Sequence, residues 1–259
     1  MRLKTHPPVR KLLLFLLLLL LLTACRADSG TWERIQQDGI LRVGLDPTYP
    51  PFEIGDENGL RGIDVDLAEA IAHEMGLGDV DFVWIGYDGL YDGLLTGKVD
   101  LLISALIIVP SQMDDFAYST PYFDAGERLI VPTDSTITSM DDLTSVAVEL
   151  GAQGHVEALA WQKTVPDLKI QPYNTAEEAL TAVLEKNADG VVMDGINGRL
   201  FLQSHPDLRI LPDPVTMGPF AIVVRKDDQV LLKELNDVLE ILGKNGRLDE
   251  ILAKWLDEQ

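Results

Sequence analysis

Cysteine is almost absent from this chain, because Cys25 is the only one among its 259 residues. A disulfide needs two thiols, so no disulfide can close a loop within the chain, and its stability must come from a buried core. Histidine is scarce as well, with four residues, and His73, His155 and His205 are scattered rather than grouped as metal ligands. The sequence therefore predicts no disulfide scaffold, no metal site and no cofactor.

Positive charge is also in short supply. The chain has 21 lysine and arginine residues against 42 aspartate and glutamate residues, and four of the basic residues lie within the first eleven positions. The rest of the chain is strongly acidic, and an acidic surface repels nucleic acids and anionic lipids. A nucleic-acid partner is therefore not expected, whereas the capture of cations is compatible with this charge.

No apolar run is long enough for a membrane-spanning helix, which needs about 20 residues. Leu12–Leu22 is a run of eleven apolar residues that follows a basic start and precedes small polar residues. This order is typical of a removable signal peptide, which we assign to residues 1–24.

The sequence at the end of the leader, Leu22-Thr23-Ala24-Cys25, resembles the lipobox of bacterial lipoproteins. The resemblance implies that Cys25 becomes the new amino terminus and carries fatty acids such as palmitate. Two or more acyl chains give stable anchoring. We therefore expect an exported protein anchored to the cell membrane by lipid, facing the periplasm or the outside, with residues 25–38 as its tether and a first amphipathic stretch. A chance cysteine behind an ordinary cleavage site is the alternative.

Beyond the tether the chain alternates between apolar strands and amphipathic helices. Asp64 is a candidate N-cap of one helix, and Thr175 with Glu178 forms a capping box before another. Continuous apolar strands between helices are typical of parallel sheets covered on both faces, so the fold class is α/β. Because the pattern restarts after residue 131, two sheets are favoured over one. The expected strands are 40–45, 80–85, 99–103, 129–131, 146–150, 190–193 and 221–224.

Several local phrases, in their order and spacing, resemble the family 3 bacterial solute-binding proteins, the receptors of polar amino-acid ABC importers. They include Leu41-Arg42-Val43-Gly44, Tyr49-Pro50-Pro51-Phe52-Glu53, Gly62-Ile63-Asp64-Val65-Asp66, Ser119-Thr120-Pro121-Tyr122-Phe123 and Asn245-Gly246-Arg247-Leu248.

The resemblance implies a two-lobed, periplasmic-binding-protein-like (type II) fold, in which each lobe is a sheet flanked by helices. Two hinge crossings are expected, near Val131 and Met217. Lobe 1 would then contain residues 39–131 and 218–259, and lobe 2 residues 132–217. The ligand is expected between the lobes, so that binding and closure are one equilibrium.

The residues that bind a ligand carboxylate in this family are replaced here. Ser104, Ala105 and Leu106 open the stretch that aligns with the carboxylate motif, but Ile107 occupies a threonine position and Gln112 the arginine position. In lobe 2 the corresponding turn reads Gly151-Ala152-Gln153, which keeps backbone donors at a helix start but no hydroxyl groups.

The residues expected to contact an amine are retained. Asp194 matches the ammonium-binding aspartate of lobe 2, and Asp46 matches a position that binds a distal cation. Tyr49 and Tyr87 match two rings that enclose the ligand, and Phe52 lies near the first, with core packing as its favoured interpretation. Without the resemblance, Asp46 would be interpreted as a turn residue and Asp194 as a cap.

An arginine is the strongest partner for a carboxylate, and an unpaired buried carboxylate is costly. We therefore expect a monomeric receptor for an amino acid or related small amine, with cationic character and without a free α-carboxylate or bound in another orientation. It would pass this ligand to a separate ABC permease.

One alternative is a periplasmic cyclohexadienyl dehydratase on the same fold, although Asn197 stands where that branch has a catalytic glutamate. Another is a ligand-sensing lipoprotein that acts through a partner.

Overall fold

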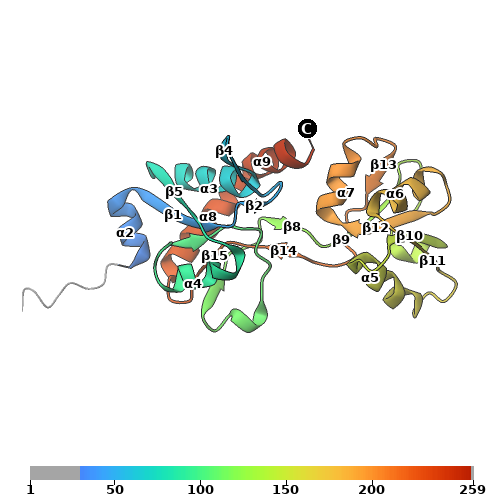
Figure 1. Cartoon of the computed structure of the whole chain (residues 1–259), viewed down its shortest axis with the longest axis horizontal. Coiled ribbons are helices and arrows are strands. Elements are labelled where there is room, and N and C mark those ends of the chain that lie inside the picture. Colours follow the sequence, from blue (N-terminus) through green and yellow to red (C-terminus); the bar gives the residue numbers. More distant parts are fainter. Residues whose placement is uncertain (1–29, 258–259) are drawn as a thin grey trace, which may run out of the picture.

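The computed structural model describes residues 30–257. The leader expected at residues 1–24 and the lipidation expected at Cys25 lie outside these residues. Within residues 30–257, every helix is too short or too polar to span a bilayer. Figure 1 shows two α/β lobes at opposite ends of the long axis, which confirms the expected fold class.

Lobe 1 is built around a five-stranded sheet. Its strands are β1 (Ile40–Leu45), β5 (Asp79–Trp84), β6 (Leu101–Leu102), β7 (Phe116–Tyr118) and β15 (Val223–Arg225). They lie in the order β5-β1-β6-β15-β7, with β1 parallel to β5 and β6, and with β15 antiparallel to β6 and β7. Because β15 follows lobe 2 in the sequence, lobe 1 combines both ends of the described chain.

Helices cover both faces of this sheet. They are α2 (Thr31–Asp38), α3 (Ile63–Glu74), α4 (Leu90–Leu95), α8 (Gln229–Lys244) and α9 (Arg247–Leu256). Side chains alternate across a strand, so Leu101 and Ile103 pack with α3 and α8 while Leu102 packs with α4. The buried, continuous apolar strands thus have the environment that their sequence predicted.

Lobe 2 repeats this plan with a second five-stranded sheet. Its strands are β9 (Glu127–Pro132), β10 (Ser145–Glu149), β11 (Lys169–Tyr173), β12 (Gly190–Asp194) and β13 (Leu208–Ile210), and its helices are α5 (Gln153–Gln162), α6 (Ala176–Leu184) and α7 (Gly195–Leu202). The order is β11-β10-β12-β9-β13, with β10 parallel to β11 and β12. Thr175 accepts a hydrogen bond from the Glu178 N–H group at 3.1 Å, as predicted for the start of α6.

Short elements complete the chain. The small strands β2 (Thr48–Tyr49), β3 (Glu53–Asp56) and β4 (Gly59–Arg61) form a separate sheet between β1 and α3. The 3-10 turns are η1 (Tyr87–Gly89), η2 (Pro110–Gln112) and η3 (Met140–Asp142).

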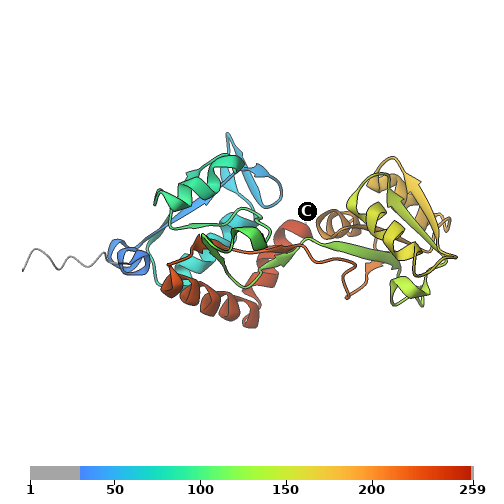
Figure 2. The same cartoon turned by 90° about the horizontal axis from the view of Figure 1, so that it is seen from below.

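The first crossing between the lobes lies earlier than expected. Strand β9 pairs antiparallel with β12 and β13 and so belongs to lobe 2, which moves the crossing from Val131 to the region of Gly126. Here β8 (Phe123–Asp124) pairs with β14 (Pro219–Phe220), and Figure 2 shows the two crossing segments side by side. An apolar pattern identifies a strand but not the sheet that it joins, which is why the sequence misplaced this boundary.

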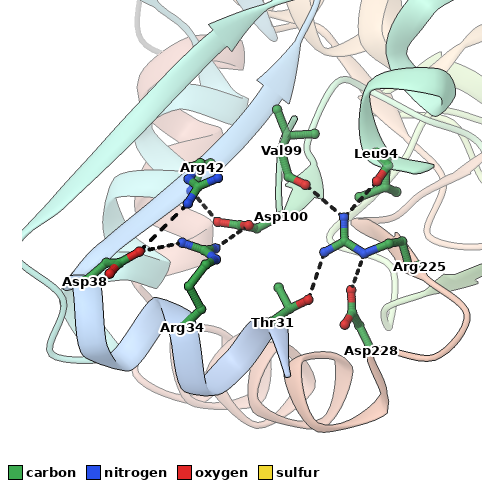
Figure 3. A network of polar contacts seen from close by, with 9 residues as sticks. All are labelled: Thr31, Arg34, Asp38, Arg42, Leu94, Val99, Asp100, Arg225 and Asp228. Carbon is green, nitrogen blue, oxygen red and sulfur yellow. Dashed lines mark hydrogen bonds and ion pairs between the residues drawn. The ribbon is translucent and has the colours of Figure 1, made fainter. Parts of the chain in front are cut away.

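Two arginine-centred networks tie the first helix to the sheet of lobe 1 (Figure 3). Arg34 of α2 forms an ion pair with Asp100, which is 2% exposed and also accepts a hydrogen bond from the Arg42 N–H group at 2.9 Å. Arg225 of β15 donates to the Thr31 hydroxyl of α2 at 2.9 Å and to the carbonyl oxygens of Leu94 and Val99 at 2.7 and 2.9 Å. The first described helix is therefore fixed to lobe 1 by buried polar contacts.

Replacing Asp100 should be costly because the Arg34 Nη2 group and the Arg42 N–H group would both lose a buried acceptor, although Arg34 would keep its contact with Asp38. We expect Asp100→Ala to lower the free energy of unfolding by about 2–4 kcal/mol, measured by urea denaturation. The control is Asp237→Ala, which removes an exposed ion pair with Lys233 and should change stability by less than about 0.5 kcal/mol. Equal effects of the two variants would contradict the structural role of Asp100.

Candidate functional site

The candidate residues of lobe 1 gather at one edge of its sheet. Strands β1, β5 and β6 are parallel, so their carboxyl ends meet at the same edge. Asp46 follows β1, Tyr87 follows β5 and Ser104 follows β6. In open α/β sheets the crevice outside the carboxyl ends of the strands is where ligands bind.

A cavity of about 380 Å³ opens at this edge. Six candidates from the sequence line it, together with two residues that sequence reasoning missed, Thr48 and Phe220. The full lining is Asp46, Thr48, Tyr49, Tyr87, Ser104, Ala105, Ile107 and Phe220. None of these residues is basic, so the cavity wall carries one negative charge and no positive charge.

Asp46 is held in place by its neighbours. One carboxylate oxygen accepts a hydrogen bond from the Thr48 hydroxyl at 2.8 Å, and the other accepts from the Tyr87 N–H group at 2.8 Å. The Asp46 N–H group donates to the Ser104 hydroxyl at 3.0 Å. Asp46 is thus a turn residue and also the acidic group of the cavity, which unites the two interpretations of its sequence position.

Apolar and aromatic side chains stand open beside Asp46. Tyr49, Tyr87 and Ile107 are 48%, 63% and 52% exposed, which is unusual for side chains of this size. Their exposed faces are available to a flat or cationic group, since a cation over a ring is attracted by the π-electrons.

Two candidates support the cavity from the core instead of lining it. Phe52 is fully buried, stacks against Tyr49 with the ring centroids 6.0 Å apart, and meets the rings of Phe123 and Phe220 edge-on. Leu106 is 1% exposed and belongs to the core around α4. Phe52 therefore has the core-packing role that its sequence position favoured, whereas the burial of Leu106 removes its side chain from the candidates for ligand contact.

Asp64 has a different role from the predicted N-cap. The N-cap position of helix α3 is Gly62, two residues earlier than predicted, and the buried Asp64 carboxylate accepts a hydrogen bond from the Ala105 N–H group at 2.7 Å. Ala105 has a φ of 44°, a left-handed conformation that non-glycine residues rarely adopt. Asp64 therefore fixes a strained turn at the cavity floor.

A second buried carboxyl group lies beside Asp64. Glu53 is 0% exposed, and its carboxyl group interacts with the Asp64 carboxyl group and the Ser104 side chain. Burial, followed by the charge of Asp64, raises the pKa of Glu53, and burial also raises the pKa of Asp64. The Tyr122 hydroxyl is buried in the same cluster, where burial and then Asp64 raise its pKa. The raised pKa of Glu53 means that this buried pair should keep a proton to a higher pH than an exposed glutamate would.

Gln112 is not part of the cavity lining. It ends η2, and its side-chain carbonyl accepts a hydrogen bond from the Tyr118 hydroxyl at 3.2 Å. The position at which the resemblance implied a carboxylate-binding arginine is therefore engaged with a neighbouring strand.

The candidates of lobe 2 lie at the carboxyl ends of β10 and β12. Gly151 has a φ of 86° and precedes Ala152, the N-cap position of α5. Ala152 provides no side-chain hydrogen bond to the helix, which begins at Gln153. Asp194 caps α7 by accepting from the N–H groups of Ile196 and Asn197 at 3.1 and 2.9 Å.

The charge of Asp194 reaches across to lobe 1. Burial, then Asp194, then Glu53 raise the pKa of the Tyr49 phenol, so Asp194 lies on the side of lobe 2 that faces the cavity. Sequence reasoning missed one further acid of this region, Glu127 at the start of β9, which is 7% exposed. The position of this acid at the start of a buried apolar strand is the sequence feature that could have identified it.

Two lobes with facing strand ends define a solute-binding architecture. The profile of the bacterial extracellular solute-binding proteins, family 3, matches residues 41–258, and the chain belongs to this family. The L-cystine-binding protein TcyJ of Escherichia coli (strain K12) is 26% identical over 234 residues, which are 88% of this chain and 87% of TcyJ.

Solved structures agree with this family. A structure of an ancestral cationic amino acid solute-binding protein, AncCDT-1, is 33% identical with a TM-score of 0.62, over 88% of this chain and 100% of that chain. An ancestral cyclohexadienyl dehydratase, AncCDT-3, has the same fold, with a TM-score of 0.76 at 23% identity over 88% of this chain and 97% of that chain.

The buried proton of Glu53 should make stability depend on pH. The folded state keeps the Glu53 proton above the ordinary glutamate pKa, whereas the unfolded chain releases it. The contribution of Glu53 to the free energy of unfolding is therefore greatest at low pH and falls as the pH rises. Between pH 5 and pH 8 we expect Glu53→Gln, which cannot ionise, to reduce this fall by up to about 1.4 kcal/mol per pH unit. Urea denaturation at several pH values measures the slope.

The exposed Glu69→Gln on α3 serves as control and should leave the slope unchanged. An unchanged slope in Glu53→Gln would show that Glu53 does not hold this proton.

Proposed function

We propose that this protein is the extracytoplasmic receptor of an ABC importer and that it captures an amino acid or a related small cationic amine between its lobes. The observation that carries the proposal is the cavity of about 380 Å³, where Asp46 meets the exposed rings of Tyr49 and Tyr87. A carboxylate between aromatic faces is suited to an ammonium or guanidinium group. The names of the relatives, which include a cystine-binding and a cationic amino acid-binding protein, agree with such a ligand.

Lobe closure supplies the second half of the site. Asp194 of lobe 2 is the acidic group opposite the cavity, and the two lobes are joined by the paired strands β8 and β14. Asp124 of β8 accepts hydrogen bonds from the N–H groups of Gly126 and Gly218 at 2.9 and 2.7 Å, which ties both crossing segments together. A ligand that contacts Asp46 and Asp194 at once would favour the closed form by its differential affinity.

We favour a binding protein over a dehydratase on the same fold. Asn197, at the position of the catalytic glutamate in that enzyme branch, donates from its side-chain amide to the Asp194 carboxylate at 2.8 Å. An amide cannot serve as a general acid or base at neutral pH. Asn197 is thus suited to hold Asp194 in position and unsuited to proton transfer.

The proposal includes the location. A signal peptide at residues 1–24 and a lipidated Cys25 would export the chain and leave a monomer on the membrane, beside the permease that receives its ligand. This part depends on the lipobox-like Leu22-Thr23-Ala24-Cys25 and on membership of an extracellular solute-binding family.

Ligand screening tests the binding function. In a thermal-shift screen of amino acids, polyamines, guanidines and betaines, we expect cationic compounds to raise the unfolding temperature, since a ligand at 1,000 times its dissociation constant adds about 4 kcal/mol. Asp46→Asn should weaken binding of the best compound by about tenfold or more in calorimetry. Asp88→Asn, an exposed neighbour outside the cavity lining, should not. Stabilisation by acidic compounds alone would refute the proposal.

Metabolic labelling tests the anchor. In bacteria fed labelled palmitate, the wild-type protein should carry the label and sediment with membranes. Cys25→Ser should abolish both properties, because no other cysteine is available. Label retained by Cys25→Ser would disprove lipidation at this residue.

A further inference from the structure

Glu127 is a buried acid in lobe 2 with an incomplete set of partners. It opens β9 and lies directly opposite Asp194 in the antiparallel register with β12. The residue is 7% exposed, and its Oε2 is buried without a hydrogen-bond partner among residues 30–257. Leaving a buried charged oxygen unpaired is costly, so such a group calls for an explanation.

The Glu127 carboxyl group lies against the first turn of helix α5. The place that a Cβ atom would take on Gly154 is 2.6 Å from the Val192 carbonyl oxygen and 2.9 Å from the Glu127 Oε2, so only glycine fits between them. The N-cap position of α5, Ala152, has no side-chain oxygen to accept a hydrogen bond. The first N–H groups of a helix attract anions. Glu127 thus places an acid of the protein itself beside this turn, although its Oε2 accepts no hydrogen bond from it.

The surroundings of Glu127 are acidic. Burial, then Asp194, then Glu157 raise the pKa of Glu127 to about 7. The basic residues of the adjacent elements have other partners among the described residues: Arg128 pairs with Asp124, Arg199 with Asp257, and Arg209 with the carbonyl oxygens of Ser135 and Ile137. No group of three His, Cys, Asp or Glu side chains within residues 30–257 is arranged to hold a metal ion.

We propose that Glu127 determines ligand specificity: its carboxyl group lies buried beside the anion-attracting first turn of α5, and lobe 2 therefore selects an amine or guanidine that lacks an α-carboxylate. A ligand carboxylate at this turn would meet the like charges of Glu127 and Asp194. An ammonium or guanidinium group would instead be attracted by both. The inference rests on the proposed receptor function and names the ligand class more narrowly.

Agmatine and L-arginine are matched probes, because they differ only in the α-carboxylate. At pH 8, where Glu127 is largely ionised, we expect calorimetry to show wild-type protein binding agmatine at least about tenfold more tightly than L-arginine. Glu127→Gln should reduce this preference by about fivefold or more. Glu177→Gln, an exposed acid in the first turn of α6, should keep it.

A pH comparison on the wild type needs no variant. Between pH 6 and pH 8 the preference for agmatine should increase as Glu127 loses its proton, and in Glu127→Gln it should stay constant. Asp194 and Glu157 also face Glu127 and are present in both proteins, so their own effect on the preference is the same in the two measurements.

The outcomes separate the two proposals. Equal affinity of the wild type for both probes, or an unchanged preference in Glu127→Gln, would overturn the role of Glu127 and leave the receptor function standing. Binding of other compounds of the screen but of neither probe would overturn the role of Glu127, and failure of the wild type to bind any compound of the screen would overturn the receptor function, and the inference with it.

Discussion

The hydrogen bond from the Ala105 N–H group to the buried carboxylate of Asp64, at 2.7 Å, joins helix α3 to the turn after strand β6. The arrangement of the cavity depends on it. Ser104 precedes the strained Ala105 and accepts a hydrogen bond from Asp46, whose side chain in turn accepts one from the Tyr87 N–H group. One buried acid thus positions, through a continuous chain of contacts, the Asp46 carboxylate and the Tyr87 ring, which both line the cavity.

Acidic side chains lie in both lobes, with Asp46 in lobe 1 and Asp194 and Glu127 in lobe 2. In the proposed receptor, their like charges would oppose lobe closure when no cation lies between them. A cationic ligand would remove this repulsion. Selectivity and lobe closure would then depend on the same side chains, and the ligand would favour the closed form by its differential affinity.

Much of the fold could be predicted because the sequence follows simple local rules. Continuous apolar runs gave the buried parallel strands, and Thr175 with Glu178 marked the start of α6. The first crossing was misplaced because the apolar side chains of β9 would suit either sheet. Asp64 and Glu127 were missed as site residues because their roles depend on Ala105 and Gly154, partners distant in sequence. Sequence periodicity does not contain such contacts.

The fixed position of helix α2 has a mechanical consequence. Arg34 and Arg225 bind this helix to lobe 1, and Figure 1 shows it at the end of lobe 1 that points away from lobe 2. A chain held at the membrane ahead of α2 would keep lobe 1 as the stationary body. Lobe 2 would then be the lobe that moves. Its orientation would tell a permease whether a ligand is bound.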